Sequence, residues 1–88
     1  MKLLFDRRFL KDIETIKNKP LKRQVEIILT SIENAETLKD ISNLKKLKGH
    51  KSAYRIRVGN YRIGFFFQNN TIIFTRLLLR KDVYKYFP

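Results

Sequence analysis

The apolar positions in the first third of the chain recur at the spacing of an α-helix. One set follows Asp6, a residue suited to cap a helix, and predicts a helix over about residues 7–17. A second set follows Pro20, which suits a first helical turn, and predicts a helix over about residues 21–33. The two sets are Phe9, Leu10, Ile13 and Ile16, and Leu21, Val25, Ile28, Leu29 and Ile32. We therefore expect a helical hairpin, preceded by a short apolar strand at residues 2–5.

From residue 54 onward, apolar and polar positions alternate as they do in a strand with one buried face. Gly59-Asn60 interrupts this alternation and fits a type II′ hairpin turn. A second turn is expected at residues 68–70, and the closing residues 80–88 suggest one helical turn. The pattern thus predicts three strands, over residues 54–58, 61–67 and 71–78. Between them and the helices, apolar residues at every third position of segment 34–49 leave open a short helix or a connection packed on the sheet.

This order of elements, β-α-α-β-β-β, predicts an α+β fold. We expect the two helices to cover one face of a small antiparallel sheet, in a single domain spanning residues 1–88. The chain has no cysteine and one histidine, His50, which argues against disulfide scaffolds, zinc ribbons and thiol chemistry. No segment resembles a signal peptide or a membrane span, so we expect a soluble, cytoplasmic protein without a membrane partner.

Positive charge is concentrated in the second half of the chain. The net charge is +12, and residues 41–88 carry eleven Lys or Arg residues against one acid, Asp82. Nine of the eleven Phe and Tyr residues also follow residue 40. Such a field attracts polyanions, and we favour nucleic acid over an acidic protein or a membrane surface as the partner.

The predicted hairpin gathers three arginines on one face of the sheet. A two-residue turn places Arg57 opposite Arg62 and Arg55 opposite Gly64, with all three arginines facing away from the helices. Facing like charges destabilise a hairpin, and a bound polyanion would offset that cost. The planar guanidinium matches phosphate oxygens, so we predict a phosphate-binding surface, with an open spot at Gly64. The alternative is that these arginines only solvate an exposed sheet face.

The residue types restrict the chemistry that such a surface could support. A metal-dependent nuclease needs clustered carboxylates, and a paired-histidine ribonuclease needs two histidines. The remaining option is metal-free cleavage of RNA by its own 2′-hydroxyl, which the protein orients while it stabilises the charged transition state. Arginine is a poor base, so Tyr84, Tyr86 or Tyr61 could transfer protons or stack on a base, with Lys81 or Lys85 assisting.

Three segments of the chain resemble the signature of the RelE/ParE superfamily of toxins. These are Leu47-Lys48-Gly49, the run from Tyr54 to Ile63, and the ending Arg80-Lys81-Asp82-Val83-Tyr84. The resemblance implies the toxin of a type II toxin–antitoxin pair. Members of the RelE branch cut messenger RNA in the ribosomal A site through 2′-hydroxyl attack, without a metal or other cofactor. The implied partners are a cognate antitoxin, the ribosome and mRNA.

The resemblance also implies roles for individual residues. Arg55 and Arg57 match a basic pair that contacts phosphate, and Arg62 matches an arginine that stabilises the transition state. Arg80 matches the arginine of the closing motif, and Tyr84 matches a tyrosine that stacks on the cut codon. The catalytic candidates are therefore Arg57, Arg62, Arg80 and Tyr84. The candidates for binding RNA phosphates are Arg55, Lys45, Lys46, Lys48, Lys51, Lys81 and Lys85.

Two departures from the family pattern keep other functions open. Leu78 and Leu79 stand just before Arg80, where many relatives have a histidine or another polar residue. Arginine at both positions of the basic pair also removes a lysine that could act as a base. The alternatives are a ParE-like inhibitor of DNA gyrase, or a catalytically weak relic that binds only antitoxin and nucleic acid.

Overall fold

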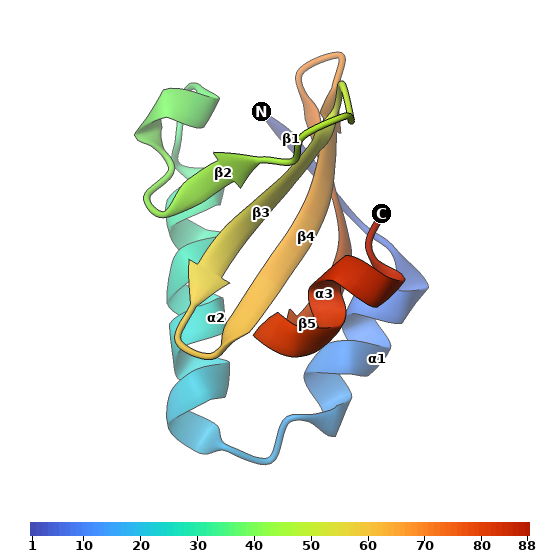
Figure 1. Ribbon diagram of the computed structural model, residues 1–88. Coiled ribbons are helices and arrows are strands. Elements are labelled where there is room, and N and C mark those ends of the chain that lie inside the picture. Colours follow the sequence, from blue (N-terminus) through green and yellow to red (C-terminus); the bar gives the residue numbers. More distant parts are fainter.

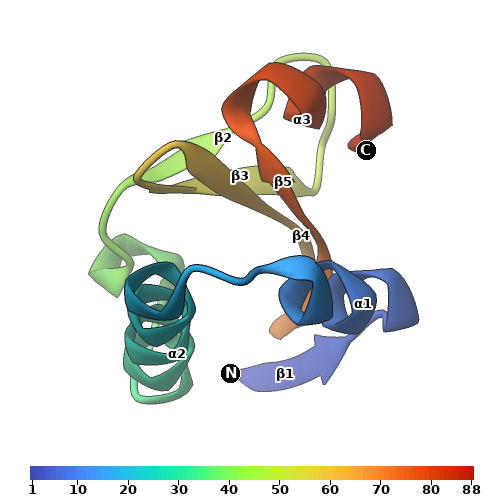
Figure 2. The ribbon, with the colours of Figure 1, turned by 90° about the horizontal axis from the view of Figure 1, so that it is seen from below.

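A five-stranded sheet with the order β1-β5-β4-β3-β2 forms the centre of the computed structural model, which describes all 88 residues (Figure 1). The elements are β1 (Lys2–Phe5), α1 (Arg7–Thr15), α2 (Lys19–Glu33), a short 3-10 helix (Leu38–Asp40), β2 (Leu44–Lys46), β3 (Ala53–Val58), β4 (Tyr61–Gln68), β5 (Thr71–Leu79) and α3 (Arg80–Tyr86). Figure 2 shows α1 and α2 on one side of the sheet and α3 on the other. The expected α+β class is confirmed.

Both N-terminal helices begin at the polar residues that cap them. The Asp6 side chain accepts a hydrogen bond from the Arg8 backbone N–H at 2.8 Å, and Asn18 Oδ1 accepts one from Leu21 N–H at 3.1 Å. Each bond satisfies an N–H that has no partner within its helix. Helix α1 ends at Thr15, slightly before the expected position, because Ile16 already has extended backbone angles.

The core lies between the helix pair and the sheet, on the face that the alternation predicted. Its side chains are buried and apolar, and Phe9, Val25 and Ile32 from the helices meet Ile56, Ile63, Phe65 and Phe74 from the strands. Tyr54 and Tyr61 pack at its edge. Burial of this surface is the main term that holds the layers together.

The predicted hairpin register is confirmed. Val58 pairs with Tyr61, and outward from the turn Arg57 pairs with Arg62 and Arg55 with Gly64. Gly59 has φ +57°, which the first central residue of a type II′ turn requires and a residue with a side chain rarely adopts.

Two features of the sheet differ from the expectation. Strand β1 pairs in parallel with β5, from Lys2 opposite Thr71 to Phe5 opposite Phe74, so the sheet is mixed. The segment left open between helix and connection contains both a 3-10 turn at Leu38–Asp40 and an additional strand, β2, which pairs with β3. Asn43 makes the bend between them with φ +61°, a conformation that asparagine tolerates better than most residues.

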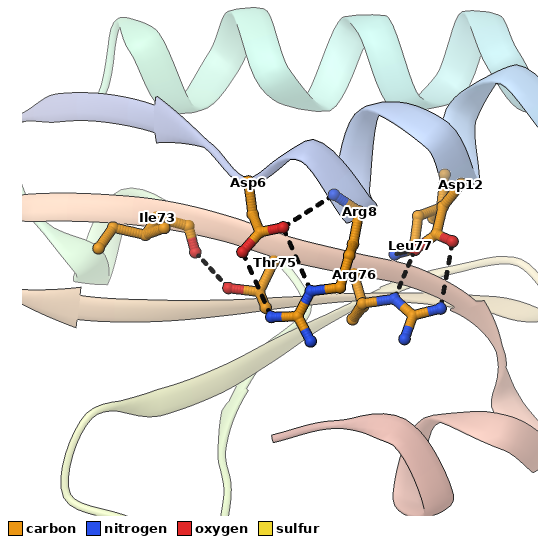
Figure 3. Close-up of polar contacts among 7 residues, drawn as sticks. All are labelled: Asp6, Arg8, Asp12, Ile73, Thr75, Arg76 and Leu77. Carbon is orange, nitrogen blue, oxygen red and sulfur yellow. Dashed lines mark hydrogen bonds and ion pairs between the residues drawn. The ribbon is translucent and has the colours of Figure 1, made fainter.

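A bulge in β5 links the sheet to α1. Gly64 pairs with Arg76 and Phe65 with Phe74, which leaves Thr75 as the extra residue on β5. Arg76 forms a two-pronged ion pair with Asp12, with Nε to Oδ2 at 2.8 Å and Nη2 to Oδ1 at 3.2 Å (Figure 3). Asp12 Oδ2 also accepts the Leu77 N–H at 2.9 Å. Asp12 therefore fixes α1 to β5 shortly before β5 leads into α3.

The C-terminal helix α3 packs on the face of the sheet opposite α1 and α2. Val83 and Phe87 are buried against Ala53, with Leu47, Phe66 and Leu78 around them. The prediction of an open spot at Gly64 is wrong, because the ring of Phe87 occupies it. The closing residues form seven residues of helix rather than a single turn. No helix in the structure has the length and apolar character needed to cross a membrane.

Candidate functional site

Four arginines gather on the α3 side of the sheet, and we call them the arginine cluster: Arg55, Arg57, Arg62 and Arg80. The first two lie on β3, Arg62 on β4 and Arg80 at the start of α3. A cleft of about 310 Å³ opens at the cluster, lined by Asn43, Leu44, Lys45, Arg55, Arg57 and Arg62. The two ion pairs of the structure, Arg8 with Asp6 and Arg76 with Asp12, lie elsewhere. The cluster therefore has no carboxylate partner and is free to bind an external anion.

Arg62 is the most buried member of the cluster and is held by the hairpin turn. Its side chain is 8% exposed, and its Nη1 donates to Gly59 O at 2.9 Å and to Tyr61 O at 2.8 Å. Burial, followed by the nearby charges of Arg55, Arg80 and Arg57, lowers the pKa of the Arg62 guanidinium. An arginine remains protonated even so, which makes Arg62 a fixed positive charge at the base of the site.

Helix α3 brings Tyr84 to the cluster. Its ring is 65% exposed, and the Arg55 guanidinium carbon lies 5.2 Å from the ring centroid, in a cation–π contact. A second cleft, of about 540 Å³, is lined by Asn60, Leu79, Arg80, Lys81 and Tyr84. The Arg80 N–H donates to Asn60 O at 2.9 Å, which ties the start of α3 to the β3–β4 turn.

The predicted lysines divide into groups. Lys45 lines the arginine cleft and Lys81 the Tyr84 cleft. Three of the six residues in the loop 46–51 are lysines, and this lysine loop surrounds a third cleft of about 390 Å³ lined by Lys46, Leu47, Lys48, Gly49, His50 and Lys51. Lys85 is exposed on α3 but lines none of these clefts.

Of the three tyrosines proposed for proton transfer or stacking, only Tyr84 lies at the cluster. Tyr61 packs against the main core on the helix side of the sheet, away from the arginine cluster. Tyr86 is 57% exposed and lines none of the three clefts. No group of three or more His, Asp or Glu side chains is placed to hold a metal ion.

Asn43 is a site residue that the sequence did not indicate. Its backbone O accepts the Arg57 N–H at 3.2 Å, and its Oδ1 lies 3.5 Å from Arg57 Nη2. Asparagine tolerates a positive φ, which marked a possible bend at this position. Its contact with Arg57, fourteen residues later, arises from the pairing of β2 with β3.

The sequence matches no protein-family model. The curated protein Toxin RelE3 of Methanocaldococcus jannaschii, however, is 43% identical to this chain. The alignment has 89 positions and covers 100% of both chains. The chain belongs to the RelE family of toxins from toxin–antitoxin systems. This confirms the family resemblance inferred from the hairpin and the closing motif.

Solved RelE structures share the fold over nearly the full length. The toxin in the RelB-RelE antitoxin-toxin complex from Methanococcus jannaschii is 41% identical, with a TM-score of 0.81 over 97% of this chain and 99% of that one. The archaeal RelE-RelB complex from Pyrococcus horikoshii gives a TM-score of 0.70 at 19% identity, covering 90% of this chain and 93% of that one. At that lower identity the match supports the RelE fold alone.

Proposed function

We propose that this RelE-family toxin is an endoribonuclease that cuts messenger RNA in the ribosomal A site, and so acts in the cytoplasm. The reaction is attack of the RNA 2′-hydroxyl on the adjacent phosphorus, with departure of the 5′-oxygen and formation of a cyclic phosphate. One observation carries the proposal. Four arginines without a carboxylate partner stand beside an exposed tyrosine, in clefts large enough for a nucleotide.

The arginines supply charge at fixed positions. Arg62, held by two backbone carbonyls, faces the phosphate with its remaining N–H groups and stabilises the charge that develops in the transition state. Arg57, Arg55 and Arg80 bind the other phosphate oxygens and align the backbone for in-line attack. Because these charges are positioned before RNA binds, little reorganisation is needed during the reaction.

The second cleft supplies the base contact and the proton chemistry. Tyr84 presents an exposed ring on which a nucleobase can stack in place of, or beside, Arg55. The 2′-hydroxyl proton must pass to a group other than arginine. Lys81 and the Tyr84 hydroxyl line the same cleft and are able to exchange it.

The lysines extend the RNA-binding surface beyond the cleaved bond. Lys45 adjoins the arginine cleft, and the lysine loop with Lys46, Lys48 and Lys51 borders the next cleft along β2. Lys85 adds to the field from α3. Phosphate contacts of this kind give affinity without sequence preference.

An acidic antitoxin is the second partner that we infer. The related toxins were solved as complexes with RelB. A chain of net charge +12 with an unpaired arginine cluster attracts an acidic segment, which would block the same surface as RNA.

Primer extension on a defined mRNA in a purified translation system tests the proposal. We expect cuts inside the A-site codon that require both the toxin and ribosomes. Arg57→Ala should abolish them, whereas Arg23→Ala, on the outer surface of α2, should leave them unchanged. Intact mRNA combined with growth arrest would contradict the proposal and favour inhibition of DNA gyrase. Intact mRNA with normal growth would favour a relic that only binds.

A further inference from the structure

A groove between α2 and the β3–β4 turn has no role in the proposed reaction. It encloses about 240 Å³ and is lined by Gln24, Ile27, Ile28, Asn43, Arg57, Val58 and Gly59. Two features set it apart from the neighbouring clefts. It contains two side-chain amides, and it exposes apolar surface, since Ile27 on α2 is 58% exposed. We call it the amide groove.

The amide groove continues directly from the arginine cleft. Asn43 and Arg57 line both, so the two spaces meet at these side chains. The Asn43 Oδ1 lies 3.5 Å from Arg57 Nη2, and the amide nitrogen of Asn43 donates no hydrogen bond within the fold. A nucleotide whose phosphate contacts Arg57 therefore has the amide groove within reach of its own base.

The lining of the groove matches the two kinds of surface that a nucleobase presents. The flat face of a base packs on apolar side chains, which the exposed Ile27 and the half-buried Ile28 provide. The edge of a base carries hydrogen-bond donors and acceptors, and the Gln24 and Asn43 amides offer both. No carboxylate lines the groove, so nothing there repels the phosphate that would accompany the base.

We propose that the amide groove is a nucleobase subsite for the nucleotide next to the phosphate bound by the arginine cluster, and that it prefers adenine. This inference rests on the RNA cleavage proposed above. Adenine is expected because Asn and Gln amides pair with its adjacent donor and acceptor in a two-bond arrangement. An apolar side chain of a protein partner would cover the isoleucines but would offer no hydrogen-bond partner to the Gln24 side chain or to the Asn43 amide nitrogen. Gln24 and Asn43 are then determinants of base preference.

Nuclear magnetic resonance of the full-length toxin, titrated with small probes, tests the subsite directly. Ribose 5-phosphate and AMP should both shift the side-chain resonances of the arginine cluster. Only AMP should also shift the methyl groups of Ile27 and Ile28 and the side-chain amides of Gln24 and Asn43. AMP should bind at least about fivefold more tightly than UMP, because a paired amide contact discriminates between bases by that much or more.

A pair of variants on α2 connects the groove to base preference. Gln24→Ala should reduce the affinity for AMP to that for ribose 5-phosphate. In the ribosome assay it should lower the ratio of cuts at adenine-containing codons to cuts at uracil-containing codons. Thr30→Ala, an exposed change six residues further along the same helix, should keep both properties of the wild type.

The alternative outcomes are distinguishable. If AMP shifts only the resonances of the arginine cluster, as ribose 5-phosphate does, the proposal of a base subsite is wrong. The proposal of a phosphate site at the arginine cluster is then retained. If an acidic antitoxin peptide shifts the groove methyls but AMP does not, the groove binds protein, which also overturns the proposal. If no probe shifts the arginine cluster, both the subsite and the proposed phosphate site are wrong.

Discussion

The ring of Phe87 lies against the backbone of Gly64 so closely that a Cβ at position 64 would stand 2.7 Å from its ring carbons. Phe87 is 3% exposed, and its ring centroid lies 5.2 Å from that of Phe66. A helix of seven residues has little stability of its own. The packing of Phe87 on Gly64 therefore holds α3 on the sheet and fixes Tyr84 beside Arg55.

Gly64→Ala should displace Phe87 and loosen α3. We expect a loss of about 1–3 kcal/mol in the free energy of unfolding, as for other overpacked cores, and a larger proportional loss of cleavage. Urea unfolding and the ribosome assay measure the two effects. Phe87→Leu in the Gly64→Ala background should restore part of both, because leucine has no rigid ring at the point of contact. Wild-type stability of the single variant would contradict the close packing.

Arg62→Ala and Arg57→Ala should affect stability in opposite directions. Arg62 satisfies two turn carbonyls, so its removal should lower the free energy of unfolding by about 1–2 kcal/mol, even though it relieves repulsion. Arg57 is exposed and has no acidic partner, so its removal should raise stability by a few tenths of a kcal/mol, in the range of surface charge effects. Urea unfolding at low salt tests this. Equal effects would mean that Arg62 does not support the turn.

Tyr84 should contribute to cleavage mainly through its ring, because Lys81 in the same cleft can exchange the proton without the Tyr84 hydroxyl. The Arg55 guanidinium faces the ring, and the exposed ring is available to a base. Tyr84→Phe should retain most single-turnover cleavage, whereas Tyr84→Ala should lose about 10- to 100-fold, the range of one base–aromatic contact. If Tyr84→Phe loses as much activity as Tyr84→Ala, the hydroxyl takes part in proton transfer and our expectation is wrong.

The lysine loop should contribute salt-dependent affinity. Replacing Lys48 and Lys51 with alanine should reduce the slope of log affinity for single-stranded RNA against log salt by about 0.7 per lost phosphate contact. The matched control replaces Lys11 and Lys19, exposed lysines on the helices that cover the other face of the sheet. Filter binding over a range of salt concentrations measures the slope. An equal reduction in the control pair would mean that the RNA has no preferred face.

Asp6 should make stability depend on pH in the acidic range. The Arg8 side-chain hydrogen bond, then the Arg8 backbone N–H, lowers the pKa of Asp6 in the folded protein. The contribution of the ionised form is therefore complete above the ordinary carboxyl pKa of about 4 and is lost as pH falls through the lower folded value. Asp6→Asn keeps a cap at all pH values. The difference in stability between the wild type and Asp6→Asn should thus be less than about 1 kcal/mol at neutral pH and should fall further below pH 4. A difference that does not change with pH would contradict this.

Local chemistry explains which parts of the fold the sequence predicts. Gly59 readily adopts the positive φ that a two-residue turn needs, and the turn sets the register that places Arg55, Arg57 and Arg62 on one face. The sequence does not determine the secondary structure of segment 34–49. Apolar residues at every third position fit a 3-10 turn as well as a strand interrupted by a bend. The parallel partner of β1 was not predictable, since nothing in residues 2–5 indicates that they pair with residues 71–74.

The features of the site that could not be predicted from the sequence depend on tertiary packing. Alternation predicts that Arg62 faces away from the helices, but its burial follows from its bonds to the turn and from the elements around it. Gly64 suggests empty space, which a ring 23 positions later fills. Asn43 joins the site only because β2 brings it beside Arg57.

The parallel pairing of β1 with β5 has a consequence for the timing of synthesis. Strand β1 cannot pair until β5 has been synthesised, because residues 2–5 have no partner until residues 71–74 have emerged. Arg80, Tyr84 and the anchoring Phe87 follow later still. A nascent chain therefore lacks the complete binding surface until residue 87 has emerged from the ribosome.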